Sequence, residues 1–241
     1  MIDGLAAASR FFPRAMRRSW VEMILGSGGI FFALVARSPL AWLAAVALVL
    51  LARGSAWRVA IDPEKKSLVA PAIGMIEVRL AAVWALTALF LFVLGMVAFV
   101  VLLCAAYAAA SAGRGFDPAS VLTWAPAVVG GGRILLGFVA AHCLVGLTYA
   151  ATRVSLAEAA TIRLSRVQVL SSFALTRGKV ASLLAANLVV AAPAIAAFAW
   201  RTTTGYSGLW AVAESLSLGM LWLPMSVGLV AYAYDVCACR K

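Results

Sequence analysis

The sequence predicts an all-α fold: a polytopic membrane helix bundle of about six transmembrane helices, with the N-terminus and the C-terminus cytoplasmic. Composition is the first observation behind this prediction. The mean hydropathy is +1.02, with 65% apolar and only 12% charged residues, whereas about half of the residues in a soluble domain are apolar. A soluble chain of 241 residues would need a larger charged surface than this sequence can build.

Long uncharged runs are the second observation. Residues 80–113, 134–152, 180–200 and 215–234 contain no Asp, Glu, Lys or Arg. Each run is long enough to cross a hydrocarbon core of about 30 Å at about 1.5 Å per helical residue. Lipid cannot satisfy unpaired backbone groups, and the runs lack the alternation typical of strands, so we expect helices.

Residues 20–53 allow two interpretations: one helix with Arg37 inside the membrane, or two short helices that turn at Arg37-Ser38-Pro39. Cytoplasmic segments are enriched in Lys and Arg, and the charge distribution favours the two-helix interpretation. The outer segments then carry only Arg37, Arg114, Arg133 and Arg201, and every other basic residue lies inside. Pro39 supports a break as well, because proline disfavours a helical conformation in the residue before it.

The aromatic residues mostly agree with this topology, because Trp and Tyr gather near both membrane surfaces. Trp84 and Trp222 do not fit either surface well. We treat residues 1–241 as a single transmembrane domain, with an interfacial segment over 1–19 and a cytoplasmic amphipathic connector over 153–179.

The N-terminal segment combines apolar residues with several arginines, and we expect it to be retained rather than cleaved as a signal peptide. As an interfacial helix it would place Arg14, Arg17 and Arg18 against anionic lipid, at roughly 1 kcal/mol per basic residue. The alternative is an ordinary basic flank of the first span. Pro13 argues against a continuous helix here.

The first span contains Gly26, Gly28 and Gly29, which we interpret as a helix-packing seam, because glycine lets another backbone approach closely. A cargo path or a hinge is the alternative. His142 lies near the centre of the span over 134–152, and Asn187 lies in the span over 180–200. These two are the candidate intramembrane polar sites, and we expect hydrogen bonds across helices, with His142 neutral and bonded to a Ser, Thr or Asn of a neighbouring helix.

The connector over 153–179 mixes apolar residues with candidate contacts for partners or lipids: Glu158, Arg163, Arg166 and Arg177. The stretch from Arg153-Val154-Ser155-Leu156 to Leu175-Thr176-Arg177-Gly178 resembles the membrane domain that accompanies some glycerophosphodiester phosphodiesterases, and related stand-alone proteins of alphaproteobacterial type. Glu77-Val78-Arg79 before a span is similar to that group too. The resemblance implies a bacterial inner-membrane bundle. The soluble phosphodiesterase domain is missing from this sequence, so no catalysis carries over.

Glu158-Ala159-Ala160 is similar to the loop by which ABC importer permeases contact their ATPase. That family expects a glycine four residues after the second alanine and a proline near the end of the loop. Leu164 and Thr176 stand at those places here.

Several classes of function are disfavoured by the sequence. Four cysteines and one histidine without zinc spacing predict no metal site, and we expect no cofactor and no catalytic residues. The net charge of +11 is spread through connectors, which predicts contact with anionic lipid and not with nucleic acid. We therefore expect a non-catalytic accessory or scaffold protein that packs against lipids, other membrane-protein subunits or further copies of itself. The alternative is an ABC-type permease subunit that contacts a separate ATPase through residues 153–179.

Overall fold

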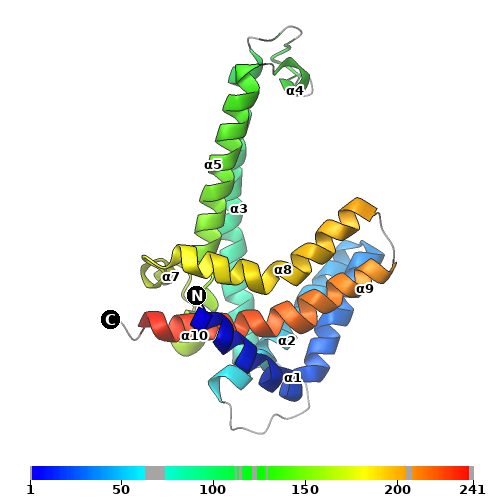
Figure 1. Ribbon diagram of the computed structural model, residues 1–241, viewed down its shortest axis with the longest axis vertical. Helices are drawn as coiled ribbons and strands as arrows, with labels where there is room; N and C mark the ends of the chain where they lie inside the picture. The colour runs from blue at the N-terminus through cyan, green and yellow to red at the C-terminus, as the bar shows by residue number, and fades with distance from the viewer. Residues whose placement is uncertain are drawn as a thin grey trace. The chain divides into compact units, whose positions relative to one another are not determined.

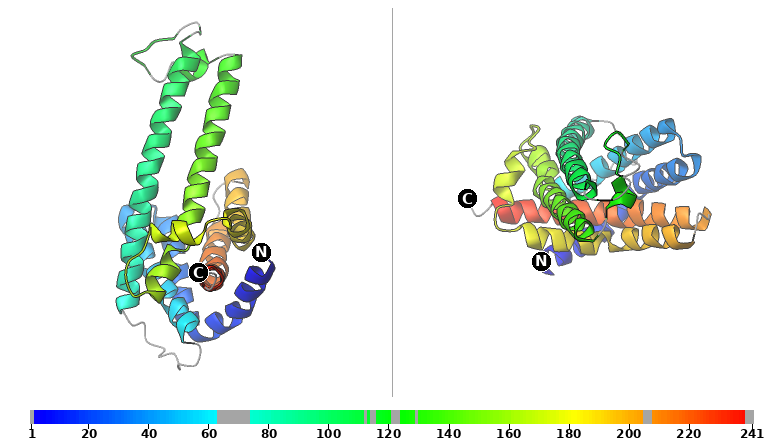
Figure 2. Two further views of the ribbon diagram at one scale, coloured as in Figure 1. Left: turned by 90° about the vertical axis from the view of Figure 1, so that its left-hand side faces the viewer. Right: turned by 90° about the horizontal axis from the view of Figure 1, so that it is seen from above.

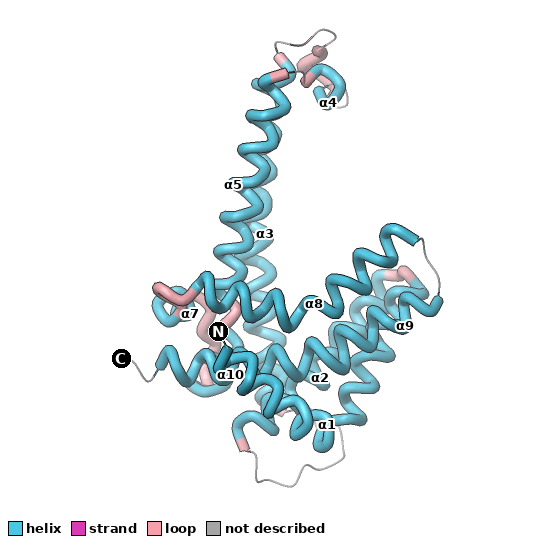
Figure 3. The backbone as a smooth tube through the Cα atoms, viewed as in Figure 1, coloured by secondary structure: helices cyan, strands magenta, loops and turns pink. Residues whose placement is uncertain are grey.

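The computed structural model describes residues 2–62, 74–111, 113, 116–120, 124–128, 130–204 and 208–238. All regular structure in these ranges is helical (Figures 1 and 3). Six helices are long and apolar enough to cross a membrane. These two findings confirm the predicted fold class. Arg114, Arg240, Lys241 and the lysines at 65 and 66, which the charge distribution used, lie outside the described residues.

The helices are α1 (Ile2–Ala36), α2 (Pro39–Ile61), α3 (Met75–Ala110), α4 (Trp124–Ala127), α5 (Gly131–Val154), α6 (Ala157–Arg163), α7 (Ser171–Leu175), α8 (Val180–Thr204), α9 (Gly208–Leu216), the π-helix η2 (Ser217–Trp222) and α10 (Leu223–Ala238). Contacts divide the chain into two compact units. We name Met1–Trp84 with Val154–Lys241 the bundle unit, and Ala85–Arg153 the hairpin unit. The prediction of one domain over residues 1–241 stays a prediction.

The turn between α1 and α2 follows directly from its three residues. Arg37 adopts a left-handed conformation with φ of 50°, and this reverses the chain at the end of α1. Ser38 is extended, as a residue before proline prefers, and its hydroxyl accepts a hydrogen bond of 3.2 Å from the Ala41 amide. Pro39 then occupies the first turn of α2, where its missing N–H costs nothing. The two-helix interpretation of residues 20–53 is therefore confirmed.

The N-terminal part of α1 is an amphipathic helix that packs on α10. Ala8 and Ala15 are fully buried, and a Cβ at Gly228 of α10 would come within 2.8 Å of the Phe11 ring. Pro13 lies inside the helix, contrary to the expected interruption, and the backbone instead departs from helical geometry at Ser19 (φ −127°, ψ 24°). This break separates the N-terminal segment from the first apolar span close to the predicted boundary.

The last span is a continuous rod made of α9, η2 and α10 (Figure 1). Pro224 explains the π-helical turn in its middle. Proline has no N–H to donate and its ring collides with the carbonyl one α-helical turn earlier. The wider π-helical turn over Ser217–Trp222 relieves this, with the Leu223 amide donating to the Leu218 carbonyl. Pro193 lies within α8, which bends in its middle (Figure 1).

The core of the bundle unit lies among α1, α2, the start of α3, α6 and α10. Its largest fully buried side chains include Met23, Trp57, Leu80, Leu156 and Leu223. α6 comes from the connector, so a segment predicted as a cytoplasmic loop contributes to the core. The connector over 153–179 contains the end of α5 and the short helices α6 and α7, with irregular backbone between α6 and α7.

The hairpin unit consists of α3 from Ala85 onward, α4 and α5 up to Arg153, with α3 and α5 side by side (Figure 2). The Cys143 thiol on α5 lies 3.8 Å from the Ala98 carbonyl on α3. At the end of the hairpin, the Tyr107 ring meets Phe116 and Trp124 edge to face at 5.2 and 5.3 Å. The helix surfaces are strongly apolar, as Phe92 and Phe138 show at 65% and 62% exposure.

Candidate functional site: a buried arginine–glutamate cluster

Arg53, which the charge distribution assigns to an inner segment, lies inside α2. α2 continues to Ile61, so Arg53 and Arg58 are helical. Arg53 is 5% exposed, and Trp57, one turn later on the same face, is fully buried. A charged residue in such a position needs compensating partners, because removing a guanidinium from water carries a large free-energy cost.

The main partner of Arg53 is Glu158 of α6. The Arg53 Nε donates to Glu158 Oε2 at 2.7 Å, and Arg53 Nη1 donates to the Ser226 hydroxyl of α10 at 2.9 Å. Ser226 in turn donates to the Leu223 carbonyl at 2.8 Å. One guanidinium therefore joins α2, the connector and the last span.

Two tryptophan indoles complete the coordination of the Glu158 carboxylate. Trp84 Nε1 of α3 donates to Oε1 at 2.6 Å, and Trp57 Nε1 donates to Oε2 at 3.3 Å. Both carboxylate oxygens thus accept from donors on other helices. Such hydrogen bonds offset the desolvation of a buried ion pair, which on its own contributes little stability.

Aromatic faces flank the Arg53 guanidinium. Its Cζ lies 5.8 Å from the Trp84 ring centroid and 5.6 Å from that of Trp222, within the range of cation–π attraction. Trp222 ends the π-helix, so the irregular turn before Pro224 is part of what presents this ring to Arg53. The two tryptophans that did not fit an interfacial position therefore belong to this cluster.

A second ion pair lies on the neighbouring face of α2. Arg58 pairs with Glu77 at the start of α3, and Glu77 Oε2 also accepts from the Gly74 amide at 2.8 Å. A Cβ on Gly54 would collide with the Glu77 side chain, so a larger residue here would require this carboxylate to shift. Glu77 is 5% exposed, so this carboxylate is buried together with its partners.

We name Arg53, Trp57, Trp84, Glu158, Trp222 and Ser226 the arginine–glutamate cluster. It ties four elements that are distant in sequence: α2, the start of α3, α6 and the η2–α10 rod. Since both oxygens of Glu158 accept hydrogen bonds from α2 and α3, the arrangement fixes the connector to the rest of the bundle unit. Sequence reasoning missed it because Arg53 and Glu158 are 105 positions apart.

The other predicted contact residues of the connector lie at the surface. Arg163 pairs with the exposed Asp235 at 3.1 Å, and Arg166 and Arg177 are exposed. Glu158 differs from them, because its side chain is 14% exposed and bonded inside the chain. The structure therefore does not present Glu158 as a contact for a partner or a lipid. Ala159 and Ala160, next to it, are 1% and 0% exposed.

The basic residues of α1 lie on the polar face that the amphipathic pattern of the N-terminal segment predicts. Arg14 and Arg17 are exposed, together with Arg10, on the face opposite to α10, whereas Arg18 is half-buried.

The glycines of the first span divide into two groups. A Cβ at Gly26 would lie 3.1 Å from the Ala52 Cβ, and one at Gly29 would lie 2.9 Å from Leu48 Cδ1 and 3.2 Å from the Ala45 Cα. These two glycines form a close seam with α2. Gly28 is exposed and has open space around it, so it takes no part in that seam.

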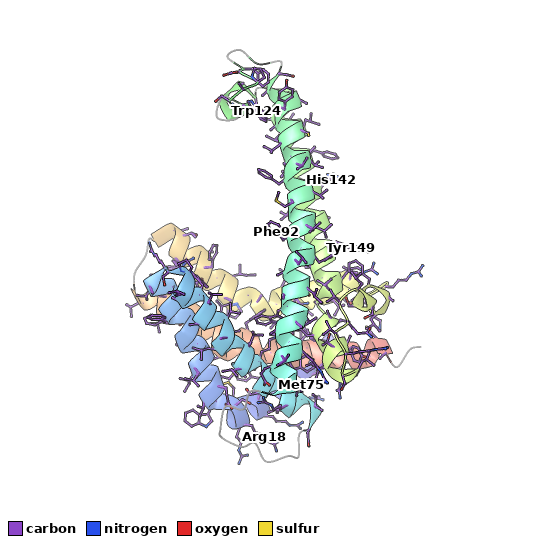
Figure 4. All side chains as sticks on the ribbon, turned by 180° about the vertical axis from the view of Figure 1, so that it is seen from behind. Arg18, Met75, Phe92, Trp124, His142 and Tyr149 are labelled. Carbon is purple, nitrogen blue, oxygen red and sulfur yellow. The ribbon has the colours of Figure 1, made fainter. Side chains whose placement is uncertain are left out.

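The two candidate intramembrane polar residues bond to their own helices. Asn187 Nδ2 donates to the Leu183 carbonyl at 2.9 Å. His142 Nδ1 lies 2.8 Å from the Phe138 carbonyl, and the two rings are 4.1 Å apart. The expected bonds across helices are absent for these residues within the described chain. His142 is exposed on α5 and is labelled in Figure 4.

A pocket of about 240 Å³ lies in the bundle unit between the first turn of α1, the start of α8 and the end of α10. Among the residues that the structure describes, no group of three or more His, Cys, Asp or Glu side chains could hold a metal ion.

No protein-family model, curated protein or solved structure matches this chain. The likeness of residues 153–178 to the phosphodiesterase-associated membrane domain therefore stays an expectation. What the fold defines is the class: this is a multi-pass membrane protein.

Proposed function

We propose that this chain is a non-catalytic accessory or scaffold protein of a bacterial inner membrane, whose α5 packs against a transmembrane helix of another subunit. The single observation that supports this most is the exposure of His142 within an apolar span. It is a polar residue on an exposed helix face in the middle of an apolar span. Polar residues within membranes almost always face protein or a water-filled cavity.

The tautomer of His142 follows from its hydrogen bond. A backbone carbonyl can only accept, so the nitrogen 2.8 Å from the Phe138 oxygen, Nδ1, carries the proton. In the neutral imidazole Nε2 is then an acceptor. Among the described residues of the hairpin unit no side chain donates to it, and hydrocarbon offers no water to do so. A donor on a partner helix would supply the missing hydrogen bond, which is worth of order 1 kcal/mol in membranes.

The surface around His142 suits a close helix contact. Gly137 has open space above it, and Ala141, one turn later, is exposed as well. Small residues one turn apart let a second helix approach closely. Phe138 and Val145, at 62% and 68% exposure, supply apolar area on either side of the histidine.

The lipid part of the proposal concerns the N-terminal helix. Its exposed Arg10, Arg14 and Arg17 would face the anionic leaflet while the opposite face packs on α10. This contact would keep the N-terminal helix in the head-group layer, beside the spans of the bundle unit.

The permease alternative requires an exposed coupling loop. Ala159 and Ala160 are buried, and both oxygens of Glu158 accept hydrogen bonds inside the bundle unit. This burial leaves the triplet unsuited to contact an ATPase, and it supports the scaffold proposal over the permease.

The test is purification of the full chain from its native membrane in mild detergent, at native expression, for three variants. His142→Leu removes the acceptor and should lose the co-purifying subunit by about tenfold, the change that ~1.4 kcal/mol produces. His142→Gln offers a carbonyl acceptor and should restore most of the recovery. Asn187→Leu is the matched control, because its amide is bonded within α8, and it should behave as the wild type.

A second, differently tagged copy of the chain distinguishes a homo-oligomer from a complex with another protein. Equal recovery of the same subunits with His142→Leu and with the wild type would contradict the proposal.

A further inference from the structure

The pocket of about 240 Å³ in the bundle unit has a polar end and an apolar end. Its polar lining includes Asp3 of α1 and Lys179 just before α8, and its apolar lining includes Leu183, Ala186 and Leu229. Ala186 lies about 10 Å further along α8 than Lys179 at the helical rise. Leu183, Ala186 and Leu229 are 7%, 2% and 2% exposed, so the apolar end is deep and the polar end is open.

Lys179 is only partly engaged. Its Nζ lies 3.4 Å from the Val236 carbonyl, a long distance for an N–H···O hydrogen bond, and 3.5 Å from the Cys237 sulfur, which is a weak acceptor. An ammonium carries three donors, so Lys179 can offer a further N–H toward the pocket.

Asp3 brings the opposite charge to the same pocket. It is exposed, and the described part of the chain contains no ion pair within 4.0 Å between Asp3 and Lys179. The pocket therefore presents one negative and one positive side chain that do not neutralise each other. A purely anionic ligand would meet the Asp3 carboxylate unfavourably, whereas a zwitterion can match both charges.

The position of the pocket agrees with a lipid ligand. The first turn of α1, the start of α8 and the end of α10 are helix ends that the charge distribution assigns to the inner membrane surface, where head groups lie. From there α8 leads away from the polar mouth toward the apolar interior, as an acyl chain does from its phosphate.

We propose that this pocket binds one phospholipid whose head group carries both a phosphate and a primary amine, as in an ethanolamine phospholipid. Lys179 donates to the phosphate, Asp3 accepts from the ammonium, and the first part of an acyl chain lies against Leu183, Ala186 and Leu229. The inference is independent of the partner helix at His142.

The experiment compares lipid retention by native mass spectrometry of the full chain in mild detergent. The probes are an ethanolamine phospholipid, an anionic phospholipid with a glycerol head group and the same acyl chains, and free phosphoethanolamine. The wild type should retain the ethanolamine lipid best. Lys179→Gln should lower the retention of both lipids about tenfold, as expected on loss of a charge-assisted hydrogen bond. Asp3→Asn should abolish the preference between the two lipids.

Two matched controls separate the pocket from general surface charge. Arg177→Gln removes an exposed cation two positions before Lys179, and Asp235→Asn removes an exposed carboxylate beside Val236; neither residue lines the pocket. Both should retain lipid as the wild type does, and an unchanged unfolding transition shows that all variants are folded.

Three results would overturn the proposal. They are equal retention of the two lipids by the wild type, an equal loss in Arg177→Gln and Lys179→Gln, and displacement of the lipid by free phosphoethanolamine at the same concentration. His142→Leu should leave lipid retention unchanged, so failure here and failure of the subunit proposal are distinguishable.

Discussion

Arg53 and His142 are both polar side chains in apolar surroundings that need hydrogen-bond partners, and the two regions of the molecule provide these partners differently. In the bundle unit, Arg53 receives a carboxylate, a hydroxyl and two aromatic faces from helices distant in sequence. In the hairpin unit, His142 receives only a carbonyl of its own helix. The comparison teaches that the bundle unit supplies the partners of Arg53 from within the chain, whereas the second ring nitrogen of His142 in the hairpin unit still needs a donor.

The same contrast holds for small residues. α2 approaches Gly26 and Gly29 of the bundle unit so closely that an added Cβ would lie 3.1 and 2.9 Å from its side chains, whereas Gly137 and Gly146 of the hairpin unit have open space within 4 Å. Glycine in a membrane helix is commonly a place of close helix approach. In one unit the approaching helix belongs to this chain, and in the other we propose that it belongs to a partner.

The largest loss of unfolding free energy should come from Glu158→Ala. Removing the carboxylate leaves the Arg53 guanidinium and two indole N–H groups without their acceptor in a buried place. Loss of one member of a buried pair costs about 3–5 kcal/mol of unfolding free energy, measured by reversible denaturation of the full chain in mixed micelles.

Asp235→Asn is the matched control for that change, since its pair with Arg163 is 33% and 51% exposed. Exposed pairs contribute at most about 1 kcal/mol, and the variant should unfold nearly as the wild type does. Equal effects of Glu158→Ala and Asp235→Asn would remove the distinction between the cluster and an ordinary surface ion pair.

The second-largest loss of unfolding free energy should come from a change in the seam between α1 and α2. Gly29→Leu would drive a side chain into Leu48 and the Ala45 backbone, and overpacking of this kind costs about 1–3 kcal/mol. Gly28→Leu, one position earlier, points into open space and should change the unfolding free energy little. If the two leucine variants unfold alike, the seam assignment is incorrect.

A smaller effect should follow from Trp84→Phe. The ring volume is largely kept, but Glu158 Oε1 loses the donor that lies 2.6 Å away. A buried acceptor left without its hydrogen bond costs about 1–3 kcal/mol, toward the lower end here because other donors remain on the carboxylate. Trp42→Phe, at a 47% exposed ring, is the control, and near-UV circular dichroism follows both transitions.

The smallest effect should be that of His142→Leu on the isolated chain. Only a hydrogen bond to its own helix is lost, and an exposed substitution of this kind stays within about 0.5 kcal/mol. Its consequence should appear in subunit recovery and not in stability. A large loss of unfolding free energy would mean that His142 serves the fold of this chain, and the contrast with Arg53 would then fail.

Much of the fold could be predicted because local signals decide it. The turn at Arg37-Ser38-Pro39 is specified by a proline, the extended residue before it and a serine able to cap. The apolar runs likewise identify their helices through length alone. The position of the helix break was not predicted, because the backbone departs from helical geometry at Ser19 and not at Pro13.

The candidate site could not be predicted in the same way. Charge counting treats every arginine beside an apolar run as a residue outside the membrane, so it gives no sign that Arg53 is buried. Its partner Glu158 was assigned to a connector, and nothing local in either segment marks the pairing. Trp84 and Trp222 carried a signal, since neither fitted an interfacial depth, and both prove to flank the buried guanidinium.

The most direct test of the contrast is site-specific photo-crosslinking in native membranes. A photoreactive residue is placed at Phe138 or Val145 beside His142, and, for comparison, at Leu188 of α8, which is 52% exposed. We expect discrete protein adducts from the two α5 positions and lipid adducts alone from Leu188. Lipid adducts alone from both α5 positions would contradict the claim that a partner completes the hairpin unit.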